Sequence, residues 1–464
     1  MRLIVNNCWT QVVAASEDEL EWLVNYLSVA QTVYSAYEGA STKQVCAFNP
    51  RRQRFPSGLA RAVHTRAMED SITCEVQDIR TRPSQLDESK IPDWLRDYQR
   101  EAIIAAAKRT RGMIVAPTGS GKGTIAVALT QCIPCNWLFL CHRTDVVDMF
   151  AKRYESLTGE TAGVWEGSHK AGSANLSVAT FQSIYRALRL KDKKVRAFLD
   201  GITGILIDEA HSASADTYGY VLSNIHNAYY RIGFSGTPLD RSAAENMQVV
   251  GAVGQVIYSI QTQTLIEAGV LSRPTIRMIN CDQKSVAGDT WIKVYTNGIV
   301  RSIQRNKLIA QIAFSADKPC LLFVDQTKHL HQLMPYLTAT GMRVEAAYGT
   351  HSTEYRNDRI RSLVKGHSDV LVCTSIFQEG VDVPSLTSVI LASGKSSVVA
   401  TIQRMGRGMR TDATTGKTTF ELFDIMDKGH RWLEKHSIER LKAYQAQGHD
   451  VYIGDLEGGS DGSR

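Results

Sequence analysis

The chain of 464 residues lacks the features of a membrane, secreted or disulfide-bonded protein. No apolar run approaches the roughly 18 residues of a membrane span, and residues 1–7 lack a signal-peptide pattern. The nine cysteines are an odd number, and several lie in apolar stretches such as residues 320–324 and 370–373, which is typical of reduced core thiols. We therefore expect a cytoplasmic protein with no disulfides and no membrane partner.

The sequence also lacks the paired cysteine motifs of a zinc finger. Cys132 and Cys135 form a Cys-x-x-Cys pair with Cys141 and His142 close behind, but no second matched pair follows at finger-like spacing. Residues 137–140 form an apolar run that is typical of a buried strand. We expect these cysteines to lie in a core, with no structural zinc.

A strong charge bias is absent as well, since the net charge is +6. Such a mildly basic chain permits a polyanionic partner without demanding one, so a case for nucleic acid must come from local patches. At roughly 150 residues per domain, the length predicts about three domains.

Two series of short apolar runs are present, each alternating with helical segments. The first series occupies residues 113–115, 137–140, 176–179, 205–207 and 231–234, and the second occupies 320–324, 343–347, 370–373, 388–392 and 418–423. This is the rhythm of parallel sheets that helices cover on both faces. It predicts an α/β fold with two tandem parallel-sheet domains and a cleft between them that a nucleotide could bridge.

We place the two α/β domains at residues 89–262 and 263–453. The linker is expected over residues 259–274, where Pro274 interrupts the pattern before a strand at 275–279. Residues 454–464 are rich in Gly, Ser and Asp, so we expect a disordered tail that carries no chemistry.

Residues 1–88 form a separate unit, which we interpret as a small α+β domain. Ser16 and Glu19 make a capping box at a helix start, and extended segments are expected at residues 3–5, 10–13, 32–37, 44–48 and 72–79. Arg51, Arg52 and Arg54 concentrate positive charge in one loop. That loop is either a solvated surface or a patch that contacts DNA phosphates, and both readings stay open.

A glycine-rich loop follows the first strand of the first series. After Ala116 the loop reads Pro117, Thr118, Gly119, Ser120, Gly121, Lys122, Gly123 and Thr124. Glycines let backbone N–H groups close around phosphates at a helix N-terminus, and a lysine adds a point charge at the β- and γ-oxygens. The loop predicts a nucleoside triphosphate site.

A carboxylate pair, Asp208 and Glu209, ends the strand at residues 205–207. Phosphoryl transfer needs one carboxylate to hold Mg²⁺ and a second group to orient the attacking water. The loop and the pair together predict that the chain hydrolyses ATP with Mg²⁺.

Further motifs surround these two. Arg96 and Gln99 lie upstream of the loop, where the Gln99 amide could bind both edges of an adenine amino/N7 face. Ser235 and Thr237 follow a strand and could sense the carboxylate pair, although a plain strand-ending turn is the alternative.

The second series carries a run of arginines near its end. Arg404, Arg407 and Arg410 recur at helical spacing after Gln403. A solvated basic face is the usual explanation, but the two glycines among them suit close approach to a ligand. Arginines brought by a second domain onto a γ-phosphate act as arginine fingers, which are worth about 10³ to 10⁵ in rate in other NTPases.

This ordered set of motifs resembles the superfamily two helicases and translocases over roughly residues 90–430. The segments that carry the resemblance are Gln99 and residues 116–122, 141–144, 180–183, 208–211, 235–238, 321–325, 374–382 and 403–410. The resemblance implies two RecA-like domains that use ATP to move along nucleic acid.

The same resemblance implies a role for individual residues. Lys122 binds phosphate, Asp208 holds Mg²⁺ and Glu209 positions the water, while His211 joins Ser235 and Thr237 in coupling. The nucleotide also meets Arg96, Gly380, Asp382, Gln403, Arg407 and Arg410. Arg143, Thr180, Gln182 and Thr374 face a nucleic-acid backbone, and Arg404 is an ion-pair partner.

Within the superfamily, the sequence is similar to the group with XPB, RecG-type and phage UvsW-type helicases rather than to DEAD-box RNA helicases. The similarity rests on the Asp-Glu-Ala-His motif, the Ser-Gly-Thr-Pro motif, Gln403, and the terminal residues Asp424, Asp427, His436, Glu439, Arg440 and Tyr444. It implies a monomeric helicase, in the host cytoplasm if phage-encoded, that unwinds or branch-migrates forked and four-way DNA during recombination, replication or repair.

One departure and three alternatives remain. Gly123 stands where the phosphate loop normally has a Thr or Ser whose hydroxyl binds Mg²⁺, so Thr124 is the substitute metal ligand that we expect. The alternatives are the motor subunit of a restriction system, an RNA helicase, and an ATP-gated DNA-binding clamp without productive turnover.

Overall fold

The computed structural model describes residues 1–35, 39–165, 169–170, 175–211, 216–236, 242–374, 386–396, 406 and 417–456. Its contacts divide the chain into two compact units. Unit 1 is Met1–Ala116 with Gly121–Ile260, and unit 2 is Pro117–Ser120 with Gln261–Arg464. Each unit is described by itself below.

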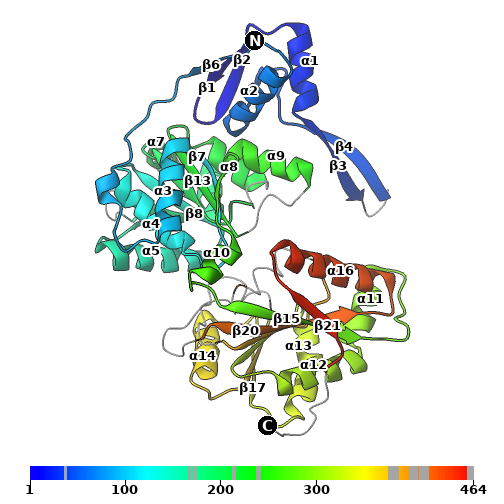
Figure 1. Ribbon diagram of the computed structural model, residues 1–464. Helices are drawn as coiled ribbons and strands as arrows, with labels where there is room; N and C mark the ends of the chain where they lie inside the picture. The colour runs from blue at the N-terminus through cyan, green and yellow to red at the C-terminus, as the bar shows by residue number, and fades with distance from the viewer. Residues whose placement is uncertain are drawn as a thin grey trace. The chain divides into compact units, whose positions relative to one another are not determined.

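The N-terminal part of unit 1 is a small α+β structure (Figure 1, blue). Its sheet has the order β5-β2-β1-β6, with β1 antiparallel to β2 and parallel to β6. The elements are β1 Arg2–Val5, β2 Trp9–Val13, α1 Glu17–Tyr26, β5 Arg54–Pro56, α2 Ala60–Glu69 and β6 Glu75–Asp78, with a separate hairpin of β3 Ser28–Ser35 and β4 Gly39–Cys46. Leu3, Leu23, Phe55 and Val63 are fully buried between the sheet and its helices. The capping box of Ser16 and Glu19 is present at the start of α1.

The rest of unit 1 is an eight-stranded sheet with helices (Figure 1, cyan to green). The order is β10-β9-β11-β8-β12-β13-β7-β14, and all neighbours are parallel except β10 and β9. Its strands are β7 Arg111–Val115, β8 Trp137–Cys141, β9 Gly163–Trp165, β10 His169–Lys170, β11 Leu176–Thr180, β12 Gly204–Ile207, β13 Tyr230–Ser235 and β14 Val256–Ser259. Its helices are α3 Asp97–Arg109, α4 Lys122–Cys132, α5 Thr144–Thr158, α6 Phe181–Arg189, α7 Lys193–Asp200, α8 Asp216–Ser223 and α9 Ala243–Ala252.

Unit 2 contains a seven-stranded, fully parallel sheet with the order β17-β18-β16-β19-β20-β15-β21. The strands are β15 Arg273–Cys281, β16 Cys320–Phe323, β17 Val344–Ala347, β18 Val370–Cys373, β19 Ser388–Leu391, β20 Thr419–Asp427 and β21 Val451–Gly454. The helices are α10 Thr262–Glu267, α11 Trp291–Tyr295, α12 Ile303–Ser315, α13 Thr327–Thr338, α14 Thr353–Val364 and α16 Arg431–Ala446. The expected α/β fold with two parallel sheets and a small N-terminal α+β structure is confirmed.

Both sheets have central strands that are buried on both faces, as their continuous apolar runs predicted. Every residue of β8, β12, β16 and β18 is buried. Such strands can exist only where helices cover the sheet on two sides, which is why the apolar runs were informative.

Several local expectations were wrong. Strand β15 begins at Arg273 and includes Pro274, which we expected to precede it. Pro274 pairs with Phe420 of β20, but it has no partner in β21, which pairs with β15 only from Ile276 onwards. The missing N–H of Pro274 therefore removes no hydrogen bond between β15 and β21. Strands β9, β10 and β14 were not expected, because each is short or lies at an edge of the sheet.

The boundaries of the expected domains stay predictions. The tail expected over residues 454–464 begins with the last residue of β21, and Asn280 Nδ2 donates to Asp455 Oδ1 at 2.9 Å, while residues 457–464 lie outside the described part. Within the described ranges, no helix is both long enough and apolar enough to cross a membrane.

Candidate nucleotide site at the carboxyl edge of the first sheet

The strand order of the first sheet brings three of the predicted motifs together. Strand β13 lies between β7 and β12, and the three are parallel, so their carboxyl ends share one edge of the sheet. The glycine-rich loop follows β7, Asp208 follows β12, and Ser235 ends β13. The backbone N–H of Ala116 donates to the Ser235 carbonyl at 2.8 Å, which ties the loop to β13.

The loop has the backbone of a phosphate cradle. Gly119 and Gly121 have φ angles of +90° and +87°, which residues with a side chain rarely adopt. Helix α4 begins immediately afterwards at Lys122, so the N–H groups of its first turn point towards the loop. The Lys122 ammonium donates to the Ala116 carbonyl at 3.0 Å and thus lies across the start of the loop.

Gln99 belongs to helix α3, and its side chain lies against the glycine-rich loop. It is 2 % exposed and occupies the first turn of α3, where its Oε1 accepts from the Arg96 N–H at 3.1 Å. A Cβ on Gly121 would lie 2.5 Å from Gln99 Nε2. The glycine therefore also makes room for the Gln99 amide, and Arg96 and Gln99 are joined through the helix cap.

The carboxylate pair is linked to β13 by a histidine. His211 Nδ1 lies 3.3 Å from Glu209 Oε2 and 3.1 Å from Ser235 Oγ. Glu209 has a φ of +46°, a strained value for a residue with a Cβ, and such strain is concentrated at functional sites. Glu209, His211 and Ser235 thus form one contact chain from the second motif to the third.

Thr124, two residues after Lys122, is a candidate metal ligand together with Asp208. Thr124 Oγ1 accepts from Arg153 Nη1 at 3.3 Å, and a Cβ on Gly123 would lie 3.3 Å from Arg153 Cδ. Asp208 and Thr124 offer hard oxygen donors, which is the ligand chemistry of Mg²⁺. No group of three or more His, Cys, Asp or Glu side chains in the described residues could hold a metal by itself, so nucleotide and water oxygens must complete such a site.

The expected nucleic-acid contacts fall in three places. Arg143 and Thr180 follow β8 and end β11, at the carboxyl edge of the first sheet, and Gln182 is exposed in the first turn of α6. Arg143 binds Asp145 through two hydrogen bonds of 2.9 and 2.5 Å. Thr374 is buried at the end of β18 in unit 2.

The basic N-terminal loop is only partly free for a ligand. Arg51 and Arg52 are exposed in a turn, whereas Arg54 lies in β5 with its guanidinium 4.3 Å from the centre of the Trp9 ring. A role of Arg51 and Arg52 in DNA binding stays a prediction.

Other expected residues lie outside the described part of the chain. They are Thr237, Gly380, Asp382, Gln403, Arg404, Arg407 and Arg410. Their positions therefore stay predictions.

The cysteines considered for zinc lie in the core. Cys132 donates to the Lys90 carbonyl at 3.4 Å, and burial raises the pKa of its thiol to about 11. Cys135 lies 3.4 Å from Ser84 Oγ, and burial raises its thiol pKa as well.

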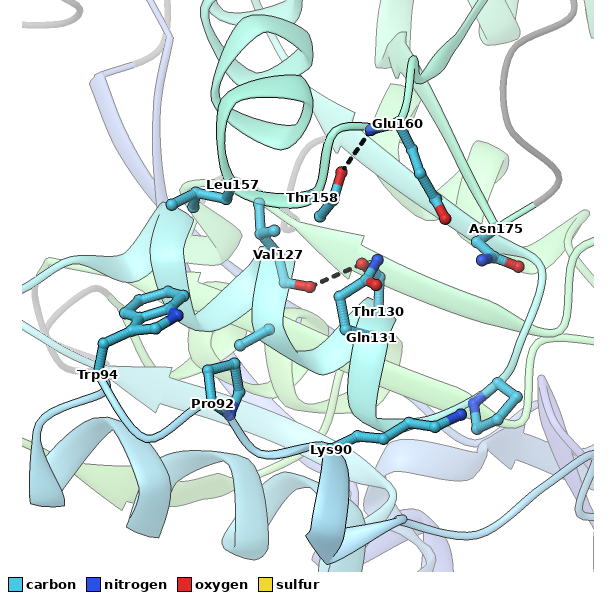
Figure 2. Close-up of a pocket in the computed structure, with 12 residues that line it drawn as sticks. Lys90, Pro92, Trp94, Val127, Thr130, Gln131, Leu157, Thr158, Glu160 and Asn175 are labelled. Carbon is cyan, nitrogen blue, oxygen red and sulfur yellow. Dashed lines mark hydrogen bonds between the residues drawn. The ribbon is translucent and has the colours of Figure 1, made fainter.

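A pocket of about 510 Å³ lies away from this site, near the opposite edge of the same sheet (Figure 2). The residues that line it include Val127 and Gln131 of α4, Thr158 at the end of α5, Glu160 just after α5, and Trp94. Figure 2 shows the hydrogen bond from Thr130 to the Val127 carbonyl. None of the predicted site residues lines this pocket.

Sequence reasoning missed an arginine that organises unit 2. Arg305 is fully buried, with Nε 2.6 Å from Asp427 Oδ1 and Nη1 donating to the Ala392 carbonyl at 2.8 Å. It fastens α12 to β20 and to the end of β19. The signal in the sequence was the pair of polar residues Arg305 and Asn306 beside the apolar residues Ile309 and Ile312 of the same helix.

Two family models match the chain in the order that its motifs predict. "Type III restriction enzyme, res subunit" matches residues 93–240, and "Helicase conserved C-terminal domain" matches residues 304–412, together more than half of the chain. The chain belongs to the superfamily two helicases. Members of this family are ATP-dependent enzymes that act on nucleic acid, and the expected family is thereby confirmed.

Relatives agree with this assignment. Helicase 22 of Sulfolobus islandicus filamentous virus is 24% identical over 75% of this chain and 66% of its own length. The "DNA 3'-5' translocase XPB2" of Sulfurisphaera tokodaii is 23% identical over 74% of this chain and 84% of its own length. This superfamily two helicase thus spans 66% and 84% of the lengths of these two relatives.

Among solved structures, a restriction-enzyme fragment shares the fold. A fragment of the HsdR subunit of a type I restriction enzyme from Vibrio vulnificus matches at 18% identity and a TM-score of 0.60, over 95% of this helicase and 81% of the fragment. The crystal structure of T4 UvsW matches at 18% identity and a TM-score of 0.45, over 98% and 99%.

Proposed function

We propose that this helicase is an ATP-driven DNA motor that remodels forked and four-way DNA. The observation that carries the proposal is the shared edge of β7, β12 and β13, where a phosphate cradle, a carboxylate pair and a connecting histidine lie together. The name of the relative XPB2, a DNA translocase, supports DNA as the track.

The chemistry follows from these residues. ATP phosphates would lie on the N–H groups after Gly119 and Gly121, with the Lys122 ammonium moving from the Ala116 carbonyl to the β- and γ-oxygens. Asp208 and Thr124 would hold Mg²⁺, which supplies charge neutralisation at the phosphates. Glu209 would orient the attacking water, and Arg407 and Arg410 with Gln403 would meet the γ-phosphate.

The contact chain offers a route from hydrolysis to movement. Glu209 touches His211, His211 touches Ser235, and Ser235 ends β13. A change of charge near Glu209 would therefore alter a hydrogen bond at the start of residues 236–241, which include Thr237. Arg143, Thr180, Gln182 and Thr374 would hold the DNA backbone, with Arg51, Arg52 and Arg54 on adjoining duplex.

The test is ATP turnover measured side by side on single-stranded, duplex, forked and four-way DNA and on RNA. Forked and four-way DNA should stimulate turnover most. Equal or greater stimulation by RNA would establish an RNA helicase, and no Mg²⁺-dependent turnover on any of them would favour the ATP-gated clamp. DNA affinity should also fall as the salt concentration rises. On duplex DNA, the slope of the logarithm of the affinity against the logarithm of the salt concentration should be about −0.9 for each phosphate that is neutralised.

A second candidate is the motor subunit of a restriction system. It is favoured by the restriction-enzyme model at residues 93–240 and by the fold match to an HsdR fragment. Such a motor works with a nuclease and follows long duplexes, so its turnover should rise with duplex length and show no preference for junctions.

A further inference from the structure

Cys8 lies where the N-terminal structure meets the first parallel sheet, and both belong to unit 1. It occupies the turn between β1 and β2, and Asn6 Oδ1 fixes this turn by accepting from the N–H groups of Cys8 and Trp9 at 2.9 and 2.8 Å. Cys8 is intermediate between buried and exposed, and we expect small molecules to reach its sulfur. Its neighbours come from the segment that leads into β13, from the start of β13 itself and from the start of β7.

These neighbours are cationic or can become so. Arg231 is 1 % exposed, and its Nη2 donates to Cys8 Sγ at 3.1 Å. His226 Nδ1 lies 3.8 Å from the same sulfur. Arg111 donates to the Asn7 carbonyl, and its buried Nε has no hydrogen-bond partner among the described residues.

The two arginines lack an anionic partner in the described part of the chain. The other contacts of Arg231 are the carbonyls of Leu222, Ile225 and Ala228, at 3.0, 2.6 and 3.2 Å. The neighbouring carboxylate Asp78 binds Arg80 at 2.7 Å instead. A buried guanidinium without a counter-charge is costly, so a negative sulfur would offset part of that cost.

The protonation equilibria point in the same direction. Burial raises the pKa of the Cys8 thiol, but Arg231, His226 and Arg111 more than offset this and the pKa is lowered overall. The hydrogen bond with Cys8 raises the pKa of His226 despite partial burial, while Arg196 lowers it and Asp200 raises it. Burial and the charge of Arg231 lower the pKa of Arg111.

We propose that Cys8 is a reactive thiolate and a modification site for hydrogen peroxide and other small electrophiles. In the reaction with peroxide, the thiolate attacks one oxygen, an S–O bond forms and the O–O bond breaks. Sulfur is oxidised to the sulfenic acid while the peroxide is reduced, and the departing hydroxide takes a proton to become water. The modified sulfur would alter the contact with Arg231, which joins the N-terminal structure to β13.

The test is alkylation of the full-length helicase by iodoacetamide over a range of pH, with each cysteine quantified by mass spectrometry. The exposed Cys46 serves as the internal reference, because its sulfur contacts only the Val24 carbonyl among the described residues. The ratio of Cys8 to Cys46 labelling should rise about tenfold as the pH falls from about 8.5 to about 6.5. Dimedone should trap the sulfenic acid at Cys8 after brief peroxide treatment.

Two variants separate the thiolate from mere exposure. His226→Gln alters an exposed side chain and should lower Cys8 labelling several-fold at the acidic end without changing that of Cys46. Arg231→Met should do the same more strongly if it folds. A Cys8 to Cys46 ratio that is independent of pH and unchanged by His226→Gln would overturn the proposal, whatever the outcome of the ATPase measurements.

Discussion

The two parallel sheets of this helicase use charged residues in opposite ways. In the first sheet, Lys122, Asp208 and Glu209 are partly exposed at the carboxyl edge. In the second sheet, Arg440 and Asp424 are both 0 % exposed and lie 2.9 Å apart, beside the equally buried pair of Arg305 and Asp427.

The difference separates charges kept for a ligand from charges kept for the fold. In the second sheet, Asp424 also accepts from Tyr444 Oη at 2.8 Å, so its oxygens are satisfied within the core. In the first sheet, Glu209 Oε2 contacts only His211, at 3.3 Å, among the described residues, and Glu209 has a strained backbone. We assign phosphoryl transfer to the carboxyl edge of the first sheet, because its charged groups can still bind a ligand and the backbone of Glu209 is strained.

The first prediction concerns Lys122, at the carboxyl edge of the first sheet, and has the largest expected effect. Lys122→Ala should lower DNA-stimulated ATP turnover about 10³-fold, since charge stabilisation at the γ-phosphate is lost. Lys152→Ala, an exposed lysine on α5, is the control and should leave turnover unchanged. If Lys122→Ala retains turnover, the phosphate cradle is assigned to the wrong loop. Much of the salt-dependent DNA binding should survive in this variant.

The second prediction removes the negative charge of Glu209 at the same edge. Glu209→Gln should lower turnover about 10²-fold, because the attacking water loses its positioned base. Glu155→Gln, an exposed glutamate on α5, should have no such effect. Equal turnover in the two variants would contradict the role of Glu209.

The third prediction breaks a buried pair of the second sheet. Asp424→Asn should lower the free energy of unfolding by about 3–5 kcal/mol, because Arg440 keeps a buried charge without a counter-ion. Asp289→Asn, which removes the exposed partner of Lys293, should cost less than about 1 kcal/mol. Urea unfolding of both variants measures the difference, and comparable losses would mean that burial does not distinguish the two pairs.

The fourth prediction concerns pH and again the interior of unit 2. Burial and the charge of Arg305 lower the pKa of His329 to about 3. The unfolded chain binds a proton near pH 6.5, so the stabilisation is complete above about pH 6.5 and is lost as the pH falls towards 3, at about 1.4 kcal/mol per pH unit.

Comparison of the wild type with His329→Gln isolates this contribution. Between about pH 7.5 and 5.5, wild-type stability should fall by about 1.4 kcal/mol more than that of the variant. Parallel stability curves for the two proteins would show that His329 titrates normally.

The last prediction returns to the first sheet and has the smallest effect. Gly123→Ala should stabilise α4 by less than about 1 kcal/mol, because the gain in helix propensity is reduced by moving the Arg153 side chain. Gly219→Ala in α8 meets nothing within 4 Å and should show the larger gain. Thermal unfolding of both variants measures which substitution stabilises the protein more. A greater stabilisation by Gly123→Ala than by Gly219→Ala would argue against the contact with Arg153.

Much of the first sheet's site was predictable because its signals are local. The glycine-rich loop and the pair Asp208 and Glu209 follow apolar strands directly, and the structure places both at one edge as parallel strands require. The three-residue strand β9 and the edge strand β14 were missed, since short strands carry little apolar pattern.

The amino-acid sequence by itself determined the two parallel sheets, the family and the order of the motifs. These depend on hydrophobic periodicity and on short segments whose chemistry is complete within a few residues. Only the tertiary structure decided which distant side chains meet: His211 with Ser235, Arg305 with Asp427, and Cys8 with Arg231. Such pairs are separated by tens to hundreds of residues, and their partners are selected by strand order and burial, which no local pattern records.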